Sequence, residues 1–312
     1  MKGLLVAERY YKFFGLPMIK SKFPDYLSRV AIGLVGEGSE CFGFDDEQSR
    51  DHDWGPGFCI WLNSEDYSEI GPLIQREYNL LPPTYAGIPQ RINTEQARGR
   101  IGVLETYAFY EKFTKLKDLP EEWYEWISIP EESLSACTNG RIFHDEFGEF
   151  SFVREKLLEF YPPDVRLKKI ADNCIKAARE GQYNYLRCIN RGEVVAADHA
   201  ESIFVNSVIK IAFLLNWRFA PFYKWSHRAL YYLPILGVKL HVSLRELIML
   251  PTSGNLTEYY NRKVEMIEAI SGILLEEIKR QQLSDVRSNY LLDHVKPILG
   301  KIENSDIRNY IP

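Results

Sequence analysis

The chain has 312 residues, of which 46% are hydrophobic and 26% charged, which is typical of a globular protein with a substantial core and suggests roughly two domains. Its formal net charge is −5, whereas a dedicated nucleic-acid binder is typically basic, so RNA is disfavoured as a substrate. A local basic patch is still compatible with this overall charge. The five cysteines are odd in number and form no CxxC pair, which disfavours a zinc ribbon and favours a reducing cytoplasm.

The N-terminal half carries short helical and strand patterns. Residues 4–14 predict an amphipathic helix that ends at Gly15 and Pro17, and its charged residues argue against a signal peptide or a membrane span. Short apolar runs predict strands, at residues 31–36, 58–62 and 100–110. The last of these runs is alternatively a strand that continues into a helix.

The C-terminal half has helical periodicity. Residues 192–216 are apolar around most of a helix, which predicts a helix buried at the centre of a bundle. Residues 255–282 predict a long amphipathic helix with Asn255 as its N-cap, and Ser284 is expected to cap one more helix. The chain is therefore expected to divide into a domain at 1–115, a connecting segment at 116–163 and a helical bundle at 164–312.

The most informative stretch is GEGSECFGFDDEQSRDHD, residues 36–53. It places Gly38 and Ser39 directly after the first predicted strand and Asp51 and Asp53 one residue apart. A glycine turn lets backbone N–H groups approach a phosphate, and Ser39 adds a hydroxyl. On a strand, Asp51 and Asp53 would point to one face, as Mg²⁺ bound to a nucleotide requires.

This arrangement resembles the signature of nucleotidyltransferases related to DNA polymerase β. Further segments, GEGSECFGFDDEQSRDHDWGP, IFHDEFGEF, YPPDVRLKKIADN and FLLNWRFAPFYKW, resemble a bacterial domain-of-unknown-function family (4037) that joins such a core to a helical domain. The resemblance covers most of the chain. It implies an α+β fold, with a polymerase-β-like domain built from a small mixed sheet and helices, followed by an all-helical C-terminal bundle.

The resemblance also implies roles for individual residues. Gly38 and Ser39 would contact the phosphates, Asp51 and Asp53 would bind Mg²⁺ or Mn²⁺, and a third carboxylate on a later strand would complete the metal site. Glu105 is the candidate for that carboxylate. The alternative is that Glu105 only opens a helix, since acidic residues favour the first helical turn.

Each of these residues also has a purely structural interpretation. Gly38, Ser39, Asp51 and Asp53 can equally form a glycine-rich loop and a solvated acidic turn. Asp45 is assigned to the loop, as is the neighbouring Asp46, with solvation or closing of the turn as their simplest role.

The helical half offers possible ligand contacts. His199, Ser202, Asn206 and Lys210 recur at helical spacing and form a polar stripe, in which Lys210 can contact a triphosphate or the stripe can simply face solvent. Lys224 lies among aromatic residues and is aimed either at a ligand or out of the core.

The sequence therefore predicts a cytoplasmic, Mg²⁺-dependent nucleotidyltransferase that moves AMP from ATP, or a nucleoside monophosphate from another triphosphate, to a hydroxyl of a small molecule, for example an antibiotic-like one. RNA or protein acceptors are less expected, and neither a membrane nor dedicated DNA binding is expected.

Two alternatives stay open. One is a nucleotide sensor or toxin–antitoxin component without efficient turnover, which a missing third carboxylate would favour. The other is a metal-dependent phosphohydrolase using the His52-Asp53 or His144-Asp145 dyad with Asp198. Nearby glycines and prolines argue against it, because that class needs its dyad on helices.

Overall fold

The structure, a computed structural model, describes residues 1–51, 53–89, 91, 99–252 and 255–311. The chain divides into two compact units. The first comprises Met1–Glu121 and Ile129–Glu159, and the second comprises Glu122–Ser128 and Phe160–Pro312. Residues 116–163, predicted to connect two domains, are therefore shared between the two units. The fold class is α+β, with a small mixed sheet and a helical C-terminal region.

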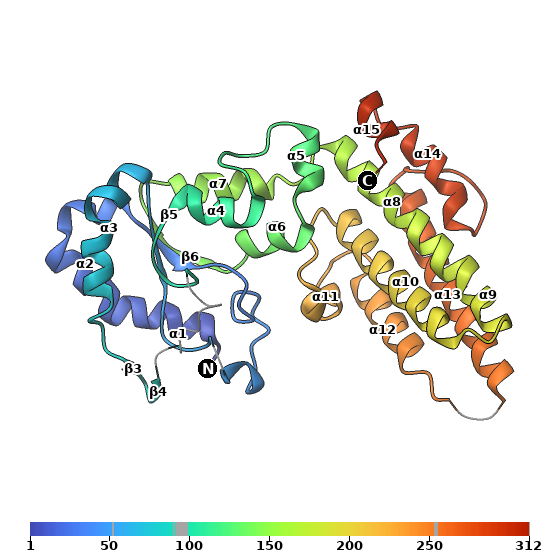
Figure 1. Ribbon diagram of the computed structural model, residues 1–312, viewed down its shortest axis with the longest axis horizontal. Helices are drawn as coiled ribbons and strands as arrows, with labels where there is room; N and C mark the ends of the chain where they lie inside the picture. Colours follow the sequence, from blue (N-terminus) through green and yellow to red (C-terminus); the bar gives the residue numbers. More distant parts are fainter. Residues whose placement is uncertain (52, 90, 92–98, 253–254, 312) are drawn as a thin grey trace. The chain divides into compact units, whose positions relative to one another are not determined.

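The first unit contains the strands and is built around one sheet (Figure 1). Its strands are β1 (Ala31–Leu34), β2 (Cys59–Leu62), β3 (Thr84–Tyr85), β4 (Ile88–Pro89), β5 (Gly102–Glu105) and β6 (Arg141–Asp145). Its α-helices are α1 (Gly3–Tyr10), α2 (Leu16–Lys22), α3 (Ser64–Tyr78), α4 (Thr106–Thr114), α6 (Glu131–Cys137) and α7 (Glu149–Leu158). Short 3-10 helices cover Pro24–Arg29 and Gln48–Arg50.

The main sheet of the first unit has the strand order β5-β2-β1-β6. β1 pairs antiparallel with both β2 and β6, whereas β2 and β5 are parallel. The described β3 and β4 form a separate hairpin. β1 and β2 are thus interior strands, and the predicted strand at 100–110 is β5 running directly into α4.

Both faces of the two interior strands of the main sheet are buried. Ile32, Ile60 and Val103 belong to a core cluster with side chains of α1, α2 and α3. Trp61 points to the opposite face, since side chains alternate along a strand. There it stacks on Phe150 of α7, with ring centroids 3.9 Å apart. Burial on both faces explains why β1 and β2 appear in the sequence as unbroken apolar runs.

The N-terminal helix does not end at Gly15 as predicted. A turn of π-helix, Tyr11–Gly15, joins α1 to α2. Gly15 is needed for packing, because a Cβ there would lie 2.4 Å from the ring of Phe58. Pro17 lies in the first turn of α2 and has no backbone N–H to donate.

The second unit is helical in its described residues. Its α-helices are α5 (Trp123–Ser128), α8 (Pro163–Ala177), α9 (Tyr185–Asn190), α10 (Val194–Leu215), α11 (Tyr223–Leu230), α12 (Gly237–Ile248), α13 (Leu256–Arg280), α14 (Val295–Leu299) and α15 (Ser305–Asn309). A π-helical segment, Ala178–Asn184, joins α8 to α9, and a 3-10 helix, Leu291–His294, precedes α14.

Helix α10 is the central helix of the second unit and packs against α8, α9 and α13. Its last nine residues are buried apart from the half-buried Lys210, which confirms the predicted central helix. A buried ion pair between Glu201 of α10 and Lys263 of α13, 2.7 Å apart, joins these two helices. Within the described residues, no helix combines the length and apolar character needed to cross a bilayer.

The two predicted helix caps have different outcomes. Asn255 caps α13 as predicted, because its side chain accepts a hydrogen bond from the Thr257 amide at 2.8 Å. Ser284 caps no helix, and its hydroxyl instead lies 2.9 Å from Nδ1 of His294. The 3-10 helix after Ser284 begins only at Leu291.

Candidate functional site

The Gly38–Ser39 pair lies in a series of turns that begins where interior strand β1 ends. The carbonyl of Gly38 accepts a hydrogen bond from the Cys41 amide at 3.0 Å, and the carbonyl of Ser39 accepts one from the Phe44 amide at 2.9 Å. Within the part of the chain that the structure describes, the amides of Gly38 and Ser39 donate no hydrogen bond. The turn therefore presents two backbone donors without an acceptor from those residues.

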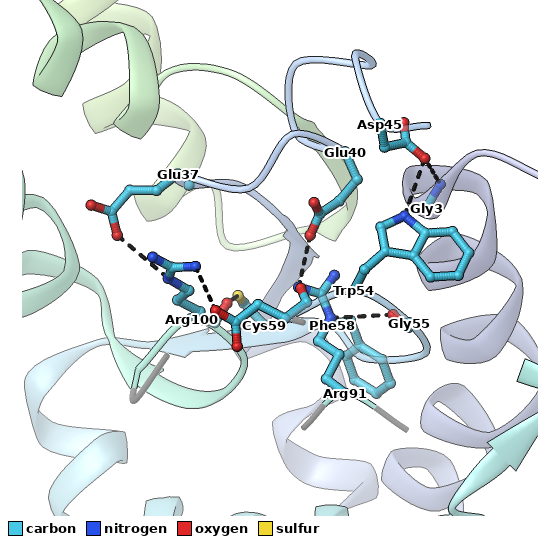
Figure 2. A network of polar contacts seen from close by, with 12 residues as sticks. Gly3, Glu37, Glu40, Asp45, Trp54, Gly55, Phe58, Cys59, Arg91 and Arg100 are labelled. Atoms are coloured by element: carbon cyan, nitrogen blue, oxygen red, sulfur yellow. Dashed lines mark hydrogen bonds and ion pairs between the residues drawn. The ribbon is translucent and has the colours of Figure 1, made fainter. Parts of the chain in front are cut away.

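Arg91 holds this turn against the segment before β2. Its Nη1 lies 2.7 Å from the Glu40 carboxylate and also donates to the Asp53 carbonyl at 2.9 Å. Its Nε donates to the Gly55 carbonyl at 3.2 Å (Figure 2). Both charged side chains are buried, with 5% of Arg91 and 3% of Glu40 exposed. Burial lowers the pKa of Arg91, but Glu40 outweighs it, so the pKa of Arg91 is raised overall.

Arg100 makes a second bridge between the same two segments. Its Nη1 lies 3.1 Å from the Asp53 carboxylate. Its Nε lies 3.6 Å from the carboxylate of Glu37 (Figure 2). Lys112 of α4 also pairs with Glu37, at 3.1 Å. We call Glu37, Glu40, Asp53, Arg91 and Arg100 the loop network. It brackets Gly38 and Ser39, because Glu37 and Glu40 flank them in the chain.

Asp45 has a structural role that differs from the predicted solvated loop. It is buried and accepts hydrogen bonds from the Gly3 amide, at 2.8 Å, and from Nε1 of Trp54, at 3.2 Å. Gly3 is the first residue of α1, so Asp45 caps that helix from a distant part of the chain. Asp46 does close a local turn, through reciprocal hydrogen bonds with Ser49.

Asp51 and Asp53 do not lie on a strand, contrary to the prediction that a strand would align their side chains. Asp51 is exposed and follows the 3-10 helix Gln48–Arg50, and Asp53 has a left-handed backbone with φ of 53°. β2 begins only at Cys59, because Gly55-Pro56-Gly57 intervenes with both glycines at positive φ. His52, named in the phosphohydrolase alternative, lies outside the described residues.

Glu105 is the N-cap of α4. Its carboxylate accepts hydrogen bonds from the amides of Tyr107, at 3.1 Å, and Ala108, and from the Ser64 hydroxyl, at 2.9 Å. It lies three residues beyond Gly102, about 10 Å further along β5. Asp53, in contrast, pairs with Arg100, which precedes β5. The structure therefore does not bring Glu105 together with Asp53.

The described residues do not gather the predicted Mg²⁺ ligands Asp51, Asp53 and Glu105 into one site. Among the described residues, no group of three or more His, Cys, Asp or Glu side chains is placed to hold a metal ion. The Glu105 carboxylate accepts hydrogen bonds from amides in the first turn of α4, and the Asp53 carboxylate accepts one from Arg100. We therefore assign no metal ligands.

The predicted ligand contacts of the helical half belong to the other unit. Lys210 is half-buried on α10, and the polar stripe that precedes it, His199, Ser202 and Asn206, is exposed. Lys224 is exposed in the first turn of α11. The structure thus places Gly38, Ser39 and Asp53 in the first unit, and both lysines in the second.

The His144-Asp145 dyad lies on strand β6 and takes part in holding the fold together. Nε2 of His144 lies 2.7 Å from the Leu27 carbonyl. The Asp145 carboxylate accepts hydrogen bonds from the amides of Gly148 and Ser151, at 2.8 and 2.9 Å, at the start of α7. A dyad on a strand lacks the helical placement that the phosphohydrolase alternative requires.

Sequence reasoning missed most of the loop network. Glu37 and Glu40 flank the Gly-Ser pair, so their position in the motif was a usable signal. Arg91 and Arg100 carry no such signal, because each contacts a carboxylate that is distant in sequence. Only the fold brings these charges together.

Comparison with known proteins finds one family. Residues 126–226 are similar to a family described as "Domain of unknown function (DUF4037)". The matched stretch begins within α5 and ends within α11, so it does not include the Gly38–Ser39 turn or the loop network. No curated protein and no solved structure matches the chain.

Proposed function

We propose that the first unit binds a nucleoside triphosphate at the Gly38–Ser39 turn, and that the protein is a nucleotidyltransferase of the DNA polymerase β superfamily. It would transfer AMP from ATP, or another nucleoside monophosphate, to a hydroxyl group of a small molecule. The observation that carries this proposal is the turn itself. It follows an interior strand, and two of its amides lack an acceptor among the described residues. Clustered backbone N–H groups of this kind favour phosphate oxygens.

The charges near the turn bear on how a triphosphate would bind. Arg91 and Arg100 are already paired with Glu40, Glu37 and Asp53, so the loop network offers little surplus positive charge. A triphosphate would therefore need a cation to accompany it. Mg²⁺ or Mn²⁺ supplies that neutralisation in nucleotide sites, where the substrate phosphates themselves provide ligands. Binding is accordingly expected to depend on the divalent ion.

In the proposed reaction, the acceptor oxygen forms a bond to the α-phosphorus while the bond to pyrophosphate breaks. The Gly38 and Ser39 amides and the Ser39 hydroxyl would hold the leaving phosphates. Arg91 and Arg100 would hold the turn and Asp53 in fixed positions relative to each other. The acceptor hydroxyl loses its proton as the bond forms, and we assign no residue to receive it.

A second candidate function is a nucleotide sensor, or a toxin–antitoxin component, that binds without efficient turnover. It is favoured by one observation: Glu105, the predicted third carboxylate, caps α4 and is not brought together with Asp53. Both candidates share the nucleotide site and differ only in whether pyrophosphate is released.

The test is the thermal stability of the purified protein with each of the four ribonucleoside triphosphates, with and without Mg²⁺. Occupancy at 100 times Kd should stabilise the first unit by about 2.7 kcal/mol. We expect a Mg²⁺-dependent shift for at least one nucleotide. Asp53→Asn should weaken it, because the change removes the charged partner of Arg100 beside the turn, and Asp46→Asn, the same change on the same loop, should retain it. No shift with any triphosphate would contradict both candidate functions.

Two further measurements separate the candidates. Glu105→Gln keeps an oxygen that can cap α4, so the nucleotide shift should survive; its loss would make Glu105 a ligand after all. Pyrophosphate release in the presence of hydroxyl-bearing acceptors then distinguishes transfer from binding alone.

A further inference from the structure

Helix α8 of the second unit contains a buried arginine that has no acidic partner among the described residues. Only 5% of Arg166 is exposed, and burial lowers the pKa of its guanidinium to about 10. Its Nε donates to the Leu214 carbonyl at 2.8 Å, and its Nη2 donates to Oε1 of Gln281 at 2.7 Å. Glu277, which contacts Gln281, pairs with Arg280 instead. Buried charges are normally paired, so the position of Arg166 requires an explanation.

Contacts within the fold account for only part of this guanidinium. Leu214 lies in the last turn of α10, where the carbonyls carry partial negative charge, so the Nε contact caps that helix. The Gln281 side chain is itself fixed, because its Nε2 donates to the Leu215 carbonyl at 2.9 Å and to the Glu277 carboxylate at 2.7 Å. Nη1 of Arg166, in contrast, donates to no described residue, and it is not one of the unpartnered atoms closed off from solvent. One end of a fixed guanidinium is therefore open.

A tryptophan covers this guanidinium from a position where glycine is usual. The Trp217 amide donates to the Leu214 carbonyl and the Arg218 amide to the Phe213 carbonyl, the two bonds of a Schellman motif at the end of α10. Trp217 has the left-handed backbone of that motif, with φ of 54°, which favours glycine over any residue with a Cβ. Its ring centroid lies 4.1 Å from Cζ of Arg166, and 47% of the residue stays exposed. A strained residue thus places a partly exposed indole beside the open guanidinium.

We propose that Arg166 and Trp217 bind a small organic anion, whose carboxylate or phosphate group accepts from Nη1 of Arg166 and whose apolar body covers the exposed part of the indole. Gln281 would hold the guanidinium in place. An anionic oxygen suits the open N–H groups, because charge-assisted hydrogen bonds are about twice as strong as neutral ones. A cation would be repelled, and a neutral ligand would leave the buried charge uncompensated. All three residues lie in the second unit, so the proposal stands whether or not the first unit binds a nucleotide.

The experiment uses the full chain and three probes of similar shape: benzoate, phenyl phosphate and the neutral benzamide. Binding is measured by tryptophan fluorescence at constant ionic strength. We expect a saturable change with at least one of the two anions, and the comparison between them identifies whether a carboxylate or a phosphate is preferred. In Trp217→Phe this change should be absent. Equal binding of benzamide, no saturable binding of either anion, or a change that persists in Trp217→Phe would overturn the proposal.

Variants assign the binding to the guanidinium. Arg166→Met should weaken anion binding by at least about tenfold, because it removes a hydrogen bond to a charged group. The matched control is Arg191→Met, an exposed arginine in the turn between α9 and α10, which should leave the affinity unchanged. Unchanged affinity in Arg166→Met, or equal weakening in the control, would overturn the proposal.

A second variant tests the site without removing the buried charge. Trp217→Gly places the usual residue at the left-handed position, so the fold should be kept, which circular dichroism melting checks. Loss of the indole should still weaken binding of the preferred anion, measured by isothermal titration calorimetry. Wild-type affinity in Trp217→Gly would contradict the proposed site, and this holds even where Arg166→Met fails to fold.

Discussion

At the scale of single residues, Gly38 has a structural reason to be glycine besides the proposed phosphate contact. A Cβ at this position would lie 2.5 Å from the carboxylate of Glu40. That carboxylate is folded back under the turn to reach the buried Arg91. A larger residue at position 38 would therefore displace the Glu40 carboxylate and disturb its ion pair with Arg91, and only ligand binding can separate the two roles.

The Arg91–Glu40 pair leads to a stability prediction. Removing one partner of a buried pair leaves the other charge without compensation, which typically costs about 3–5 kcal/mol. Arg91→Met is expected to lower the free energy of unfolding of the first unit by that amount, measured by urea denaturation. The double variant Arg91→Met/Glu40→Met should recover most of the loss, because an apolar pair carries no buried charge. A loss below about 1 kcal/mol in the single variant would show that Glu40 does not depend on Arg91.

At the scale of elements, helix pairs are joined by polar contacts that periodicity does not reveal. Glu201 and Lys263 join α10 to α13, and His227 and His241 join α11 to α12. In each case one partner lies on a different helix, so neither helix alone explains the polar group. Glu201 and Lys263 are buried, and the two histidines are half-buried. Such groups are stable only as pairs, since an unpaired buried polar group costs free energy.

The His227–His241 contact predicts how stability changes with pH. Burial lowers the pKa of His227 below its usual 6.5, and His241 and Arg245 lower it further, although a hydrogen bond to the His241 backbone opposes this. The unfolded chain therefore binds more protons than the folded one in this range. Stability of the second unit should rise with pH up to about 6.5 and fall as the solution is acidified below it.

The measurement is the melting temperature between about pH 5 and about pH 7.5, for the wild type and for His227→Gln. Glutamine keeps a donor for the His241 carbonyl but does not titrate. The wild type should lose more stability on acidification than the variant. Identical pH profiles for the two proteins would assign the dependence to other groups.

At the scale of the whole molecule, all five cysteines are free, and four of them are buried in the two units. Burial raises the pKa of Cys59, Cys137 and Cys174 to about 12 and also raises that of Cys41. The thiolate is the reactive form, so these thiols should be inert at neutral pH. Cys188 on α9 is half-buried.

A thiol reagent such as Ellman's reagent tests this distribution. In the native protein, Cys188 is expected to react alone and quickly, and all five thiols should react in denaturant. In Cys188→Ser the fast native phase should be absent. A fast phase that persists in this variant would mean that one of the buried thiols becomes accessible through opening of its unit.

Some features of this protein follow from the sequence alone, because they depend on neighbours along the chain. Apolar runs located β1, β2 and β5, and helical periodicity located α10 and α13. The Asn255 cap could be predicted because its partner is two residues away. Strand β6 was not predicted: its residues are only partly buried, so they lack an apolar run.

The partners of the charged residues were decided only by the tertiary structure. Asp45 caps a helix that begins at Gly3, Arg91 pairs with Glu40, and Asp53 meets Arg100, all across long stretches of chain. The local sequence around a carboxylate does not show whether that carboxylate caps a helix, pairs with an arginine or binds a ligand. Local sequence determines where strands and helices form, because burial patterns are periodic, whereas the role of a polar side chain depends on which group folding places within hydrogen-bonding distance.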